Sequence, residues 1–345
     1  MKRVYSGIRA TGRLHLGNYF GAVKGMLALQ DKYDCIFSVV DLHTITVPYD
    51  PKTLKQSVRE IIIDYLALGL DPKKCKLEIQ SNIPQHVELA YLLSTIYQVS
   101  RLEDLPTYKE KKAQYPKYIN MGLLYYPVLM AADVFLYKGE LVPVGIDQEP
   151  HLEVMREIAR KFNSMFGQTF PEPERLETTE EYEYIPSLFG EGKMSKSVEG
   201  SYINLTDNLD TIKARVAKIP TDSGHGRIQY EKGPLTEPKV KKFINENDEK
   251  ARGTAVLMEF VELFEGKERR LEIERLYTTG YVKYGEVKND LSEAIFKELQ
   301  QFREKRKIFK EDSKLVDGII NDGRRKCIDL AEETMKEVRK KMGLI

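Results

Sequence analysis

The sequence lacks several features that would point to particular classes of protein. It has no tryptophan, and its three cysteines, Cys35, Cys75 and Cys327, lie far apart. That spacing excludes a CxxC metal or redox motif and argues against a disulfide framework, so we expect a reducing, cytoplasmic setting. No apolar run approaches the roughly 20 residues of a membrane span, and MKRVYSGIRATG at the N-terminus lacks the apolar core of a signal peptide.

Charge of one sign is not in excess either. Lys and Arg number 54 and Asp and Glu 53 among 345 residues, so no strong overall field indicates a partner. Charged residues make up 31% of the chain, which is typical of a well-solvated globular protein. The length is sufficient for two domains, each with its own core.

The first two-thirds of the chain alternates short apolar runs with helical patterns. The runs predict strands at 3–8, 35–41, 77–80 and 141–144, and the patterns predict helices at about 16–32, 50–69, 86–99, 122–137 and 148–166, with a short connecting insertion at 105–120. Such alternation predicts an α/β fold, with a Rossmann-like parallel sheet covered by helices on both faces. In these sheets the functional site lies at the carboxyl ends of the strands.

After about Tyr202 the strand patterns stop. We expect helices at about 207–218, 236–247, 251–265, 268–278, 285–309 and 313–341, with the glycine-rich segment 221–227 as a loop. The chain is therefore predicted to consist of a catalytic α/β domain, residues 1–203, and an all-helical domain, residues 204–345. We expect the last helix to pack back on the first domain.

The junction between the first strand and the first helix, Arg9 to Asn18, is a candidate phosphate site. Free backbone N–H groups and the helix dipole favour anions at such a junction. His15 and Asn18 are three residues apart and can face the same ligand, and Gly17 permits close approach to the backbone. The junction lacks the G-x-G-x-x-G fingerprint. The alternative is a surface histidine and a helix-capping asparagine.

A second candidate phosphate site is the segment KMSKS, Lys193 to Ser197, which has neither helical nor strand periodicity. Glycines at 190, 192 and 200 bracket its two lysines, which suits a loop that closes on phosphates and opens again. It is not a P-loop, because Ser187 and Met194 stand where that motif needs glycine and Ser or Thr. The alternative is an ordinary solvated loop.

An apolar helix face carries one carboxylate. Tyr126, Met130, Asp133 and Tyr137 are spaced 4, 3 and 4 residues apart, so they share a face. A buried carboxylate without a partner costs several kcal/mol, so Asp133 indicates a binding pocket rather than a plain core stripe. Its ligand could be an indole N–H, which only donates, or a phenol O–H.

Together these motifs resemble those of the class I aminoacyl-tRNA synthetases. His15-Leu16-Gly17-Asn18 is similar to the HxGH/HxGN signature, and KMSKS is the complete second signature, in the expected order around a four-strand parallel pattern. Within this class, the resemblance is to the tryptophanyl enzymes and covers essentially the whole chain. It is carried by three further stretches, 107–111 (TYKEK), 122–133 (GLLYYPVLMAAD) and 142–148 (VPVGIDQ). The resemblance implies a catalytic Rossmann-like domain followed by an anticodon-binding helical domain.

The resemblance also implies roles for individual residues. The catalytic candidates are Lys193, Lys196, Lys111 and His15. The ATP-binding candidates are Arg9, Ala10, Thr11, Gly17, Asn18, Gly145, Ile146, Asp147, Ile185, Lys193, Met194, Ser195, Lys196 and Ser197. The amino-acid-binding candidates are Tyr5, Gly7, His43, Tyr126, Met130, Asp133, Val142, Val144 and Gln148. From local context alone, Asp147 is equally well read as a helix N-cap.

The reaction implied is activation of L-tryptophan by ATP with Mg²⁺, followed by transfer to tRNA(Trp), in a homodimer. Basic runs at 303–310, 324–326 and 339–341 are candidate contacts with RNA phosphates. We expect neither zinc nor an iron–sulfur cluster, because Cys327 stands alone in the second half. Two departures from the family pattern are Thr107, where some relatives have a glutamine near the substrate ammonium, and Arg9-Ala10, where many have Gln-Pro.

Three other functions remain open at this point. A tyrosyl-tRNA synthetase would share both signatures. A small nucleotidyltransferase would share the HxGH-type turn, but such enzymes are usually shorter and lack a large helical domain. A synthetase-like protein that binds RNA without catalysis would not need the signature lysines, which are all present.

Overall fold

The computed structural model describes residues 1–10, 12–176, 185–190, 192–195, 198–232, 238–244 and 248–344, which form two compact units. The first unit comprises Met1–Arg13, Val23–Glu181 and Arg306–Ile345, and the second comprises Leu14–Ala22 and Tyr182–Lys305. The chain therefore leaves the first unit twice, once for the short segment Leu14–Ala22 and once for the long segment that ends at Lys305, and returns to it each time. Among the described residues, no helix is both long enough and apolar enough to cross a membrane.

A five-stranded parallel sheet forms the centre of the first unit. Its strands are β1 (Arg3–Ile8), β2 (Asp34–Val39), β3 (Lys76–Ile79), β4 (Leu141–Val142) and β5 (Glu174–Arg175), in the order β3-β2-β1-β4-β5. The four predicted strands are confirmed, and β5 was missed because two polar residues carry no strand pattern. The chain order reverses between the adjacent strands β1 and β4, which is where a doubly wound sheet opens a crevice for ligands.

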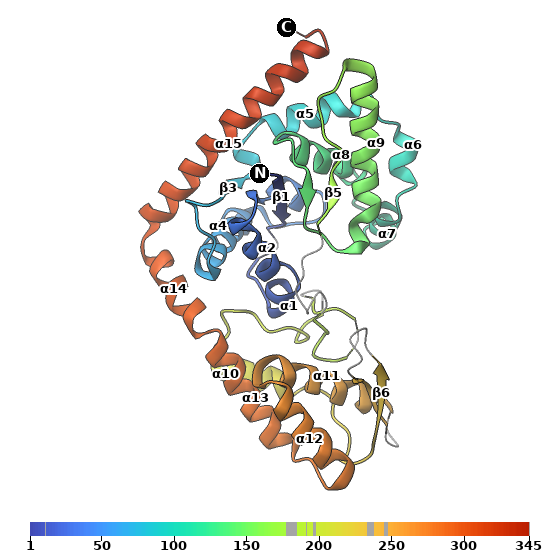
Figure 1. Ribbon diagram of the computed structural model, residues 1–345, viewed down its shortest axis with the longest axis vertical. Coiled ribbons are helices and arrows are strands. Elements are labelled where there is room, and N and C mark those ends of the chain that lie inside the picture. The colour runs from blue at the N-terminus through green and yellow to red at the C-terminus, as the bar shows by residue number, and fades with distance from the viewer. Residues whose placement is uncertain are drawn as a thin grey trace. The chain divides into compact units, whose positions relative to one another are not determined.

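Helices surround this sheet (Figure 1). In the first unit they are α2 (Lys24–Ala28), α3 (Asp41–Thr44), α4 (Pro51–Leu68), α5 (Gln85–Ser94), α6 (Val99–Glu103), α7 (Pro106–Gln114), α8 (Met121–Phe135) and α9 (Glu149–Phe166). The ends of α4 follow its sequence signals: the Asp50 side chain caps the first turn through the Lys52 N–H at 2.9 Å, and Gly69 ends it at a φ of 111°. The predicted α/β fold class is thus confirmed.

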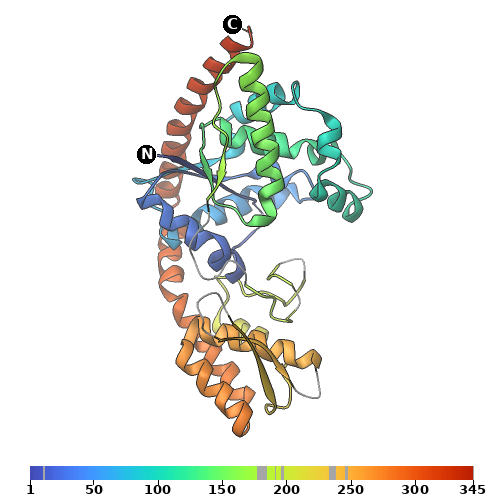
Figure 2. The ribbon, with the colours of Figure 1, turned by 45° about the vertical axis from the view of Figure 1, so that its right-hand side comes forward.

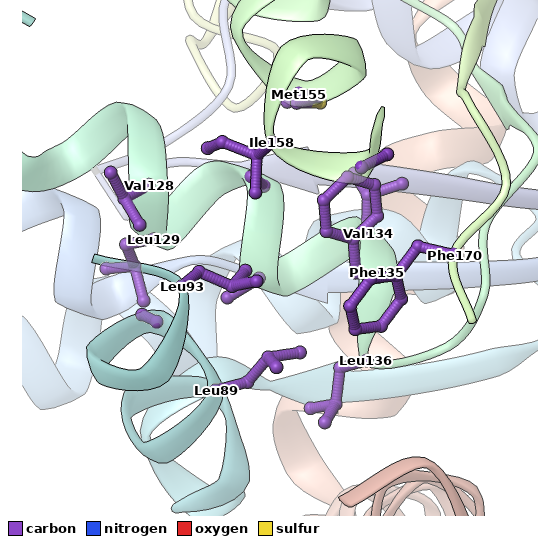
Figure 3. Packing of buried hydrophobic residues seen from close by; sticks show 14 of the residues in the cluster. Leu89, Leu93, Val128, Leu129, Val134, Phe135, Leu136, Met155, Ile158 and Phe170 are labelled. Carbon is purple, nitrogen blue, oxygen red and sulfur yellow. The ribbon is translucent and has the colours of Figure 1, made fainter. Parts of the chain in front are cut away.

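A cluster of apolar side chains fixes the position of α8. Figure 3 shows Leu89 and Leu93 of α5 and Ile158 of α9 packed around Val128 and Phe135 of α8, all buried. Burying each such side chain contributes roughly 1.5–3 kcal/mol. Because α8 is packed on this side, its other face, which carries Met130 and Asp133, is held toward the carboxyl ends of the strands.

The C-terminal helix α15 (Ser313–Lys341) completes the first unit. It lies alongside β3 and α5 (Figure 1 and Figure 2), and its buried residues Cys327, Ala331 and Met335 belong to the same apolar cluster. The Arg339 guanidinium donates to both carboxylate oxygens of Glu88 on α5, at 2.6 and 2.7 Å. The contact with the sheet is closest at Gly323, where an added Cβ would lie 1.8 Å from the carbonyl oxygen of Leu77.

The second unit is mainly helical, and it departs from the sequence prediction in two places. Its helices are α1 (Leu16–Asn18), α10 (Leu209–Val216), α11 (Asp248–Glu265), α12 (Lys267–Thr279) and α13 (Tyr284–Glu298), and α14 (Gln300–Glu311) runs from it into the first unit. The helix predicted at 236–247 is wrong: β6 (Arg227–Lys232) and β7 (Pro238–Ile244) form an antiparallel ribbon there. The helix predicted at 16–32 is interrupted by a π-helical turn at Tyr19–Val23.

We predict that Gly323→Ala lowers the free energy of unfolding by about 1–3 kcal/mol, the range for overpacking a close contact. Gly318→Ala is the matched control on the same helix, because an added Cβ there meets nothing within 4 Å. That control should gain up to about 1 kcal/mol from the higher helix propensity of alanine. Urea unfolding of both variants measures the difference, and equal effects would contradict the close packing of α15 on β3.

Candidate active site

A cavity of about 420 Å³ opens in the first unit at the carboxyl ends of β1, β2 and β4. This volume is in the range of small-molecule sites. All nine candidates for amino-acid binding line it, together with Arg9 and Lys111: Tyr5, Gly7, His43, Tyr126, Met130, Asp133, Val142, Val144 and Gln148. The sequence analysis missed other lining residues, among them Glu110 and His151. His151 lies one helical turn beyond the candidate Asp147. In a helix that spacing places two side chains on the same side, so it could have identified His151 from the sequence.

The floor of the cavity is formed by Asp133, which is 1% exposed. Its Oδ2 atom lies 2.8 Å from Nε2 of His43, and its Oδ1 atom lies 2.7 Å from Nδ1 of His86. The side-chain amide of Gln80 donates to both oxygens, at 2.8 and 2.9 Å. The carboxylate therefore has partners within the protein, two of which, Gln80 and His86, sequence reasoning did not identify.

These hydrogen bonds keep Asp133 ionised. Burial favours the neutral acid, but hydrogen bonds from His43 and His86 outweigh burial and lower the pKa of Asp133 below its ordinary value. An ionised carboxylate only accepts hydrogen bonds, so the floor of this mainly apolar cavity selects ligands that carry a donor.

A second polar cluster joins three side chains on the cavity wall. The hydroxyls of Thr107 and Tyr126 lie 2.7 Å apart, and the Tyr126 hydroxyl lies 2.7 Å from Nε2 of His151. Burial lowers the pKa of His151, which favours the neutral ring, and its Nδ1 atom is buried without a partner in the described structure. Thr107, the position that departs from the family pattern, thus orients Tyr126.

Two cations lie at the rim of the cavity. The Arg9 side chain is partly buried, and its Nε atom has no hydrogen-bond partner in the described structure. Burial disfavours the charged form of Arg9 and lowers its pKa. An anion close to the guanidinium would therefore stabilise its charge. Lys111 lies on α7, and its Nζ donates to Gln114 Oε1 at 2.7 Å. Neighbouring Ala10 is buried, and its N–H donates to Thr44 Oγ1 at 3.0 Å.

The segment after β4 is exposed at the end of the sheet. Gly145 begins the turn Ile146–Gln148, and the Ile146 side chain is 73% exposed. The Asp147 carboxylate accepts from the Gln148 side chain at 2.7 Å and caps no helix N–H, so the N-cap interpretation of Asp147 is wrong. These groups are open to a ligand at the strand end.

The second unit contains the HLGN turn. His15 is buried and is itself the N-cap of α1: its Nδ1 accepts the Asn18 N–H at 3.3 Å, while the Asn18 side chain accepts the His15 N–H at 3.2 Å. The His15 and Asn18 side chains are therefore fixed by each other's backbone. The interpretation as a surface histidine is wrong.

The two signature motifs contact each other within the second unit. The Gly17 N–H points at Sδ of Met194, 3.3 Å away, and an added Cβ on Gly17 would lie 2.9 Å from Cβ of Met194. Met194 is buried, and its N–H donates to the carbonyl of Ile185 at 2.9 Å. The glycine of one motif thus accommodates the methionine of the other.

The segment Tyr202–Leu205 connects with the HLGN turn. The Leu16 N–H donates to Ile203 O at 2.9 Å, the Leu205 N–H donates to Leu14 O at 3.0 Å, and the Tyr202 ring lies 5.9 Å from the His15 ring. On the KMSKS segment, Ser195 O accepts from the Ser201 hydroxyl at 2.9 Å, and Lys193 is exposed. The candidates Thr11, Lys196 and Ser197 lie outside the described residues.

In the described part of the chain, no group of three or more His, Cys, Asp or Glu side chains is arranged to hold a metal ion.

Comparisons with known proteins agree with this geometry. A family model described as "tRNA synthetases class I (W and Y)" matches residues 1–300. The tryptophan–tRNA ligase of Caldanaerobacter subterraneus subsp. tengcongensis is 38% identical over 100% of this chain and 99% of its own. That of Fusobacterium nucleatum is 39% identical, with the same coverage. The crystal structure of tryptophanyl-tRNA synthetase from Campylobacter jejuni, complexed with ADP and tryptophan, superposes with a TM-score of 0.83 at 31% identity and covers 99% of both chains.

We predict that Gly17→Ala displaces Met194 and the His15 ring, which an added Cβ would meet at 2.9 and 3.0 Å. The rate of the amino-acid activation that the resemblance implies should fall by at least about tenfold, because small displacements of positioning groups are costly. Gly285→Ala on α13 is the matched control, since an added Cβ there meets nothing within 4 Å. Steady-state kinetics measures both variants, and a normal rate for Gly17→Ala would contradict a functional contact between the motifs.

Proposed function

The chain belongs to the class I tRNA synthetases for tryptophan and tyrosine, and on this premise we propose that it activates L-tryptophan with ATP and transfers it to tRNA(Trp). The observation that carries the choice of amino acid is the buried, ionised Asp133 at the floor of an apolar cavity. Tryptophan offers one side-chain donor, the indole N–H, and a large apolar surface. The cavity provides the Asp133 carboxylate as an acceptor at its floor and apolar side chains such as Met130, Val142 and Val144 for that combination.

In the first step, an oxygen of the tryptophan carboxylate attacks the α-phosphorus of ATP. A carboxylate–phosphorus bond forms, the bond from the α-phosphorus to the bridging oxygen breaks, and pyrophosphate leaves. The nucleophile is already an anion, so the step needs no protein base. The chain's contribution is to position the reactants and to stabilise the charge that moves onto pyrophosphate.

We assign this stabilisation to Lys193, Lys196 and Lys111, which act as mobile point charges on phosphate oxygens. The support for Lys193 is its exposure beside the buried anchor Met194. His15 shapes the HLGN turn through its cap, and this fixed turn is where we place part of the ATP site. The remaining ATP contacts come from Arg9, Ala10, Thr11, Gly17, Asn18, Gly145, Ile146, Asp147, Ile185, Met194, Ser195 and Ser197.

Within the cavity, Asp133 and His43 take the indole end of tryptophan, while Met130, Tyr5 and the valines pack on the ring. The polar wall that contains Tyr126 takes the ammonium end, with Gln148 nearby. This arrangement leaves the substrate carboxylate on the side of Arg9, whose charge favours an anion.

In the second step, a ribose hydroxyl at the 3′ end of tRNA attacks the carbonyl of the adenylate, and AMP leaves. We propose that residues 1–203 form the catalytic domain and 204–345 the anticodon-binding domain, with the last helix returning to the first. In the basic run 303–310, Arg306 is buried and paired with Glu60 and Asp64. RNA contact therefore falls to exposed members of the run, such as Lys305 and Lys307.

We also propose a cytoplasmic homodimer. Val87 and Tyr91, one turn apart on α5, are 51% and 66% exposed, which suits an apolar contact with a second copy. Sedimentation of the full chain as a monomer would contradict this proposal.

We predict amino-acid-dependent exchange of pyrophosphate into ATP with L-tryptophan, and a kcat/KM for L-tyrosine lower by at least about a hundredfold. The reason is that indole fills the apolar cavity and still donates to Asp133. Equal or better exchange with tyrosine would make the chain a tyrosyl enzyme. No exchange with either, alongside binding of tRNA, would favour the non-catalytic protein.

We predict that Lys193→Ala and Lys196→Ala each slow adenylate formation by about a hundredfold or more, because each removes a charge that stabilises the leaving pyrophosphate. Tryptophan binding should stay close to that of the parent chain, since the proposal assigns both lysines to the phosphates of ATP and not to the amino acid. The chain has no tryptophan of its own, so the fluorescence of bound L-tryptophan measures this directly. Lys283→Ala, on an exposed position, is the control, and an unchanged rate would remove the tested lysine from the mechanism.

A further inference from the structure

A second buried carboxylate lies behind the floor of the cavity. Glu78 on β3 is 1% exposed, and His86 at the start of α5 is fully buried. The ring of His86 lies between the two acids: Nδ1 is 2.7 Å from Asp133 Oδ1, and Nε2 is 3.3 Å from Glu78 Oε2 and 3.1 Å from the Tyr137 hydroxyl. The Tyr137 hydroxyl also donates to Glu78. His86 is not among the described residues that line the cavity, so it acts on a ligand only through Asp133.

The geometry indicates that His86 is an imidazolium ion. Neutral histidine has one N–H, whereas both ring nitrogens of His86 face carboxylate oxygens. With both nitrogens protonated, the His86 ring carries one positive charge between the buried carboxyl groups of Glu78 and Asp133. Burial opposes a charge on the ring, but Glu78 and Asp133 outweigh burial and raise the pKa of His86 to about 10.

The other titratable groups around these acids are His43 on α3, Tyr5 on β1, Tyr137 after α8 and Cys327 on α15. Burial raises the pKa of Tyr5, Tyr137 and Cys327, so these three stay neutral near pH 7. The charge balance at Asp133 therefore rests on the two histidines, of which His43 lines the cavity and His86 does not.

The hydrogen bonds to Asp133 divide between these histidines in a specific way. Oδ1 accepts hydrogen bonds from His86 and Gln80, and Oδ2 accepts hydrogen bonds from His43 and Gln80. Each oxygen therefore already has two donors. A carboxylate oxygen accepts about two hydrogen bonds, so a donor on the ligand must replace one of these. His43 is the donor on the cavity side. An indole N–H of the ligand would therefore replace the hydrogen bond that His43 makes to Oδ2.

We propose that His86 is a positioning residue for amino-acid recognition: it bridges Glu78 and Asp133, holds Asp133 as an oriented anion while His43 yields to the ligand, and thereby sets the preference for a side chain with an N–H donor. This inference rests on the proposed function, because it assigns the indole N–H to Asp133. It differs from that function in predicting a role for residues that never touch the substrate.

The first test measures the protonation of His86 in the parent chain without any ligand. The ¹⁵N shifts of the histidine rings distinguish charged from neutral imidazole, and the chain has only five histidines to assign. We expect one fully protonated ring at about pH 8, well above the ordinary histidine pKa. A His86→Asn sample identifies its signal. A neutral His86 at that pH overturns the proposal, even if the variant itself does not fold.

The second test compares L-tryptophan with 3-benzothienyl-L-alanine, in which sulfur replaces the indole N–H. His86→Asn keeps an N–H near the position of Nδ1 but removes the charge. Without this cation, burial raises the pKa of Asp133, and the charged acceptor is replaced by a weaker, neutral one as the pH falls through the raised value. The measured ratio is the dissociation constant of the analogue divided by that of L-tryptophan. In the parent chain this ratio should be steady from about pH 8 to pH 6. In the variant it should fall by about tenfold at pH 6, the value of a charged hydrogen bond.

Two controls separate positioning from damage to the fold. His225→Asn makes the same change at an exposed histidine and should leave the ratio unchanged. Glu78→Gln disturbs the same buried cluster and removes one of the two carboxylates that raise the pKa of His86, so the ¹⁵N signals of His86 should show loss of its proton at a lower pH than in the parent chain. If His86→Asn weakens both ligands by one factor at both pH values, the residue is only structural and the proposal fails. If the parent chain itself does not prefer tryptophan to the analogue, the proposed function fails instead.

Discussion

The arrangement of the first unit depends on keeping one carboxylate ionised out of water. Asp133 lies on α8, and its donors come from α3, α5 and the turn after β3, so four segments of the chain meet at this one side chain. Leaving a buried charge unpaired costs several kcal/mol, and breaking such a pair by removing one partner is correspondingly costly. The apolar cluster around α8 holds the helix in place, and the donors fix the direction in which the carboxylate points. The specificity of the cavity follows from both together.

The same structure shows which parts of the fold the sequence could predict. Strand 3–8 and helix 313–341 match their predicted limits, because each is specified by its own apolar periodicity and end signals. The segment 236–247 was misread because Val240, Phe243 and Ile244 have helical spacing among lysines and glutamates, whereas β7 exists through its pairing with β6. Strand pairing is non-local, and a short charged strand leaves no mark of its own in the sequence.

The site was predictable to a similar degree and for a similar reason. The spacing on α8 was sufficient to single out Asp133 as a carboxylate that needs a partner, but not to find Gln80 and His86. Those two are distant in sequence and sit among apolar neighbours, where a polar side chain has no periodic signature. The contact of Gly17 with Met194 was likewise invisible, since it joins residues 177 positions apart. The sequence thus shows that a buried polar residue such as Asp133 needs a partner, but it does not show which residue that partner is.

The return of the chain to the first unit has a consequence for its synthesis. Cys327, Ala331 and Met335 of α15 complete the apolar cluster, and Gly323 fits against β3. A ribosome makes α15 after every other helix and strand of the first unit, so the emerging chain carries the sheet, Glu78 and His86 while the side that α15 will cover is still exposed to water. The burial that sets the charges of the site is therefore established only after α15 has been made. A prematurely terminated chain would contain the residues of the amino-acid cavity without the dry surroundings on which their discrimination depends.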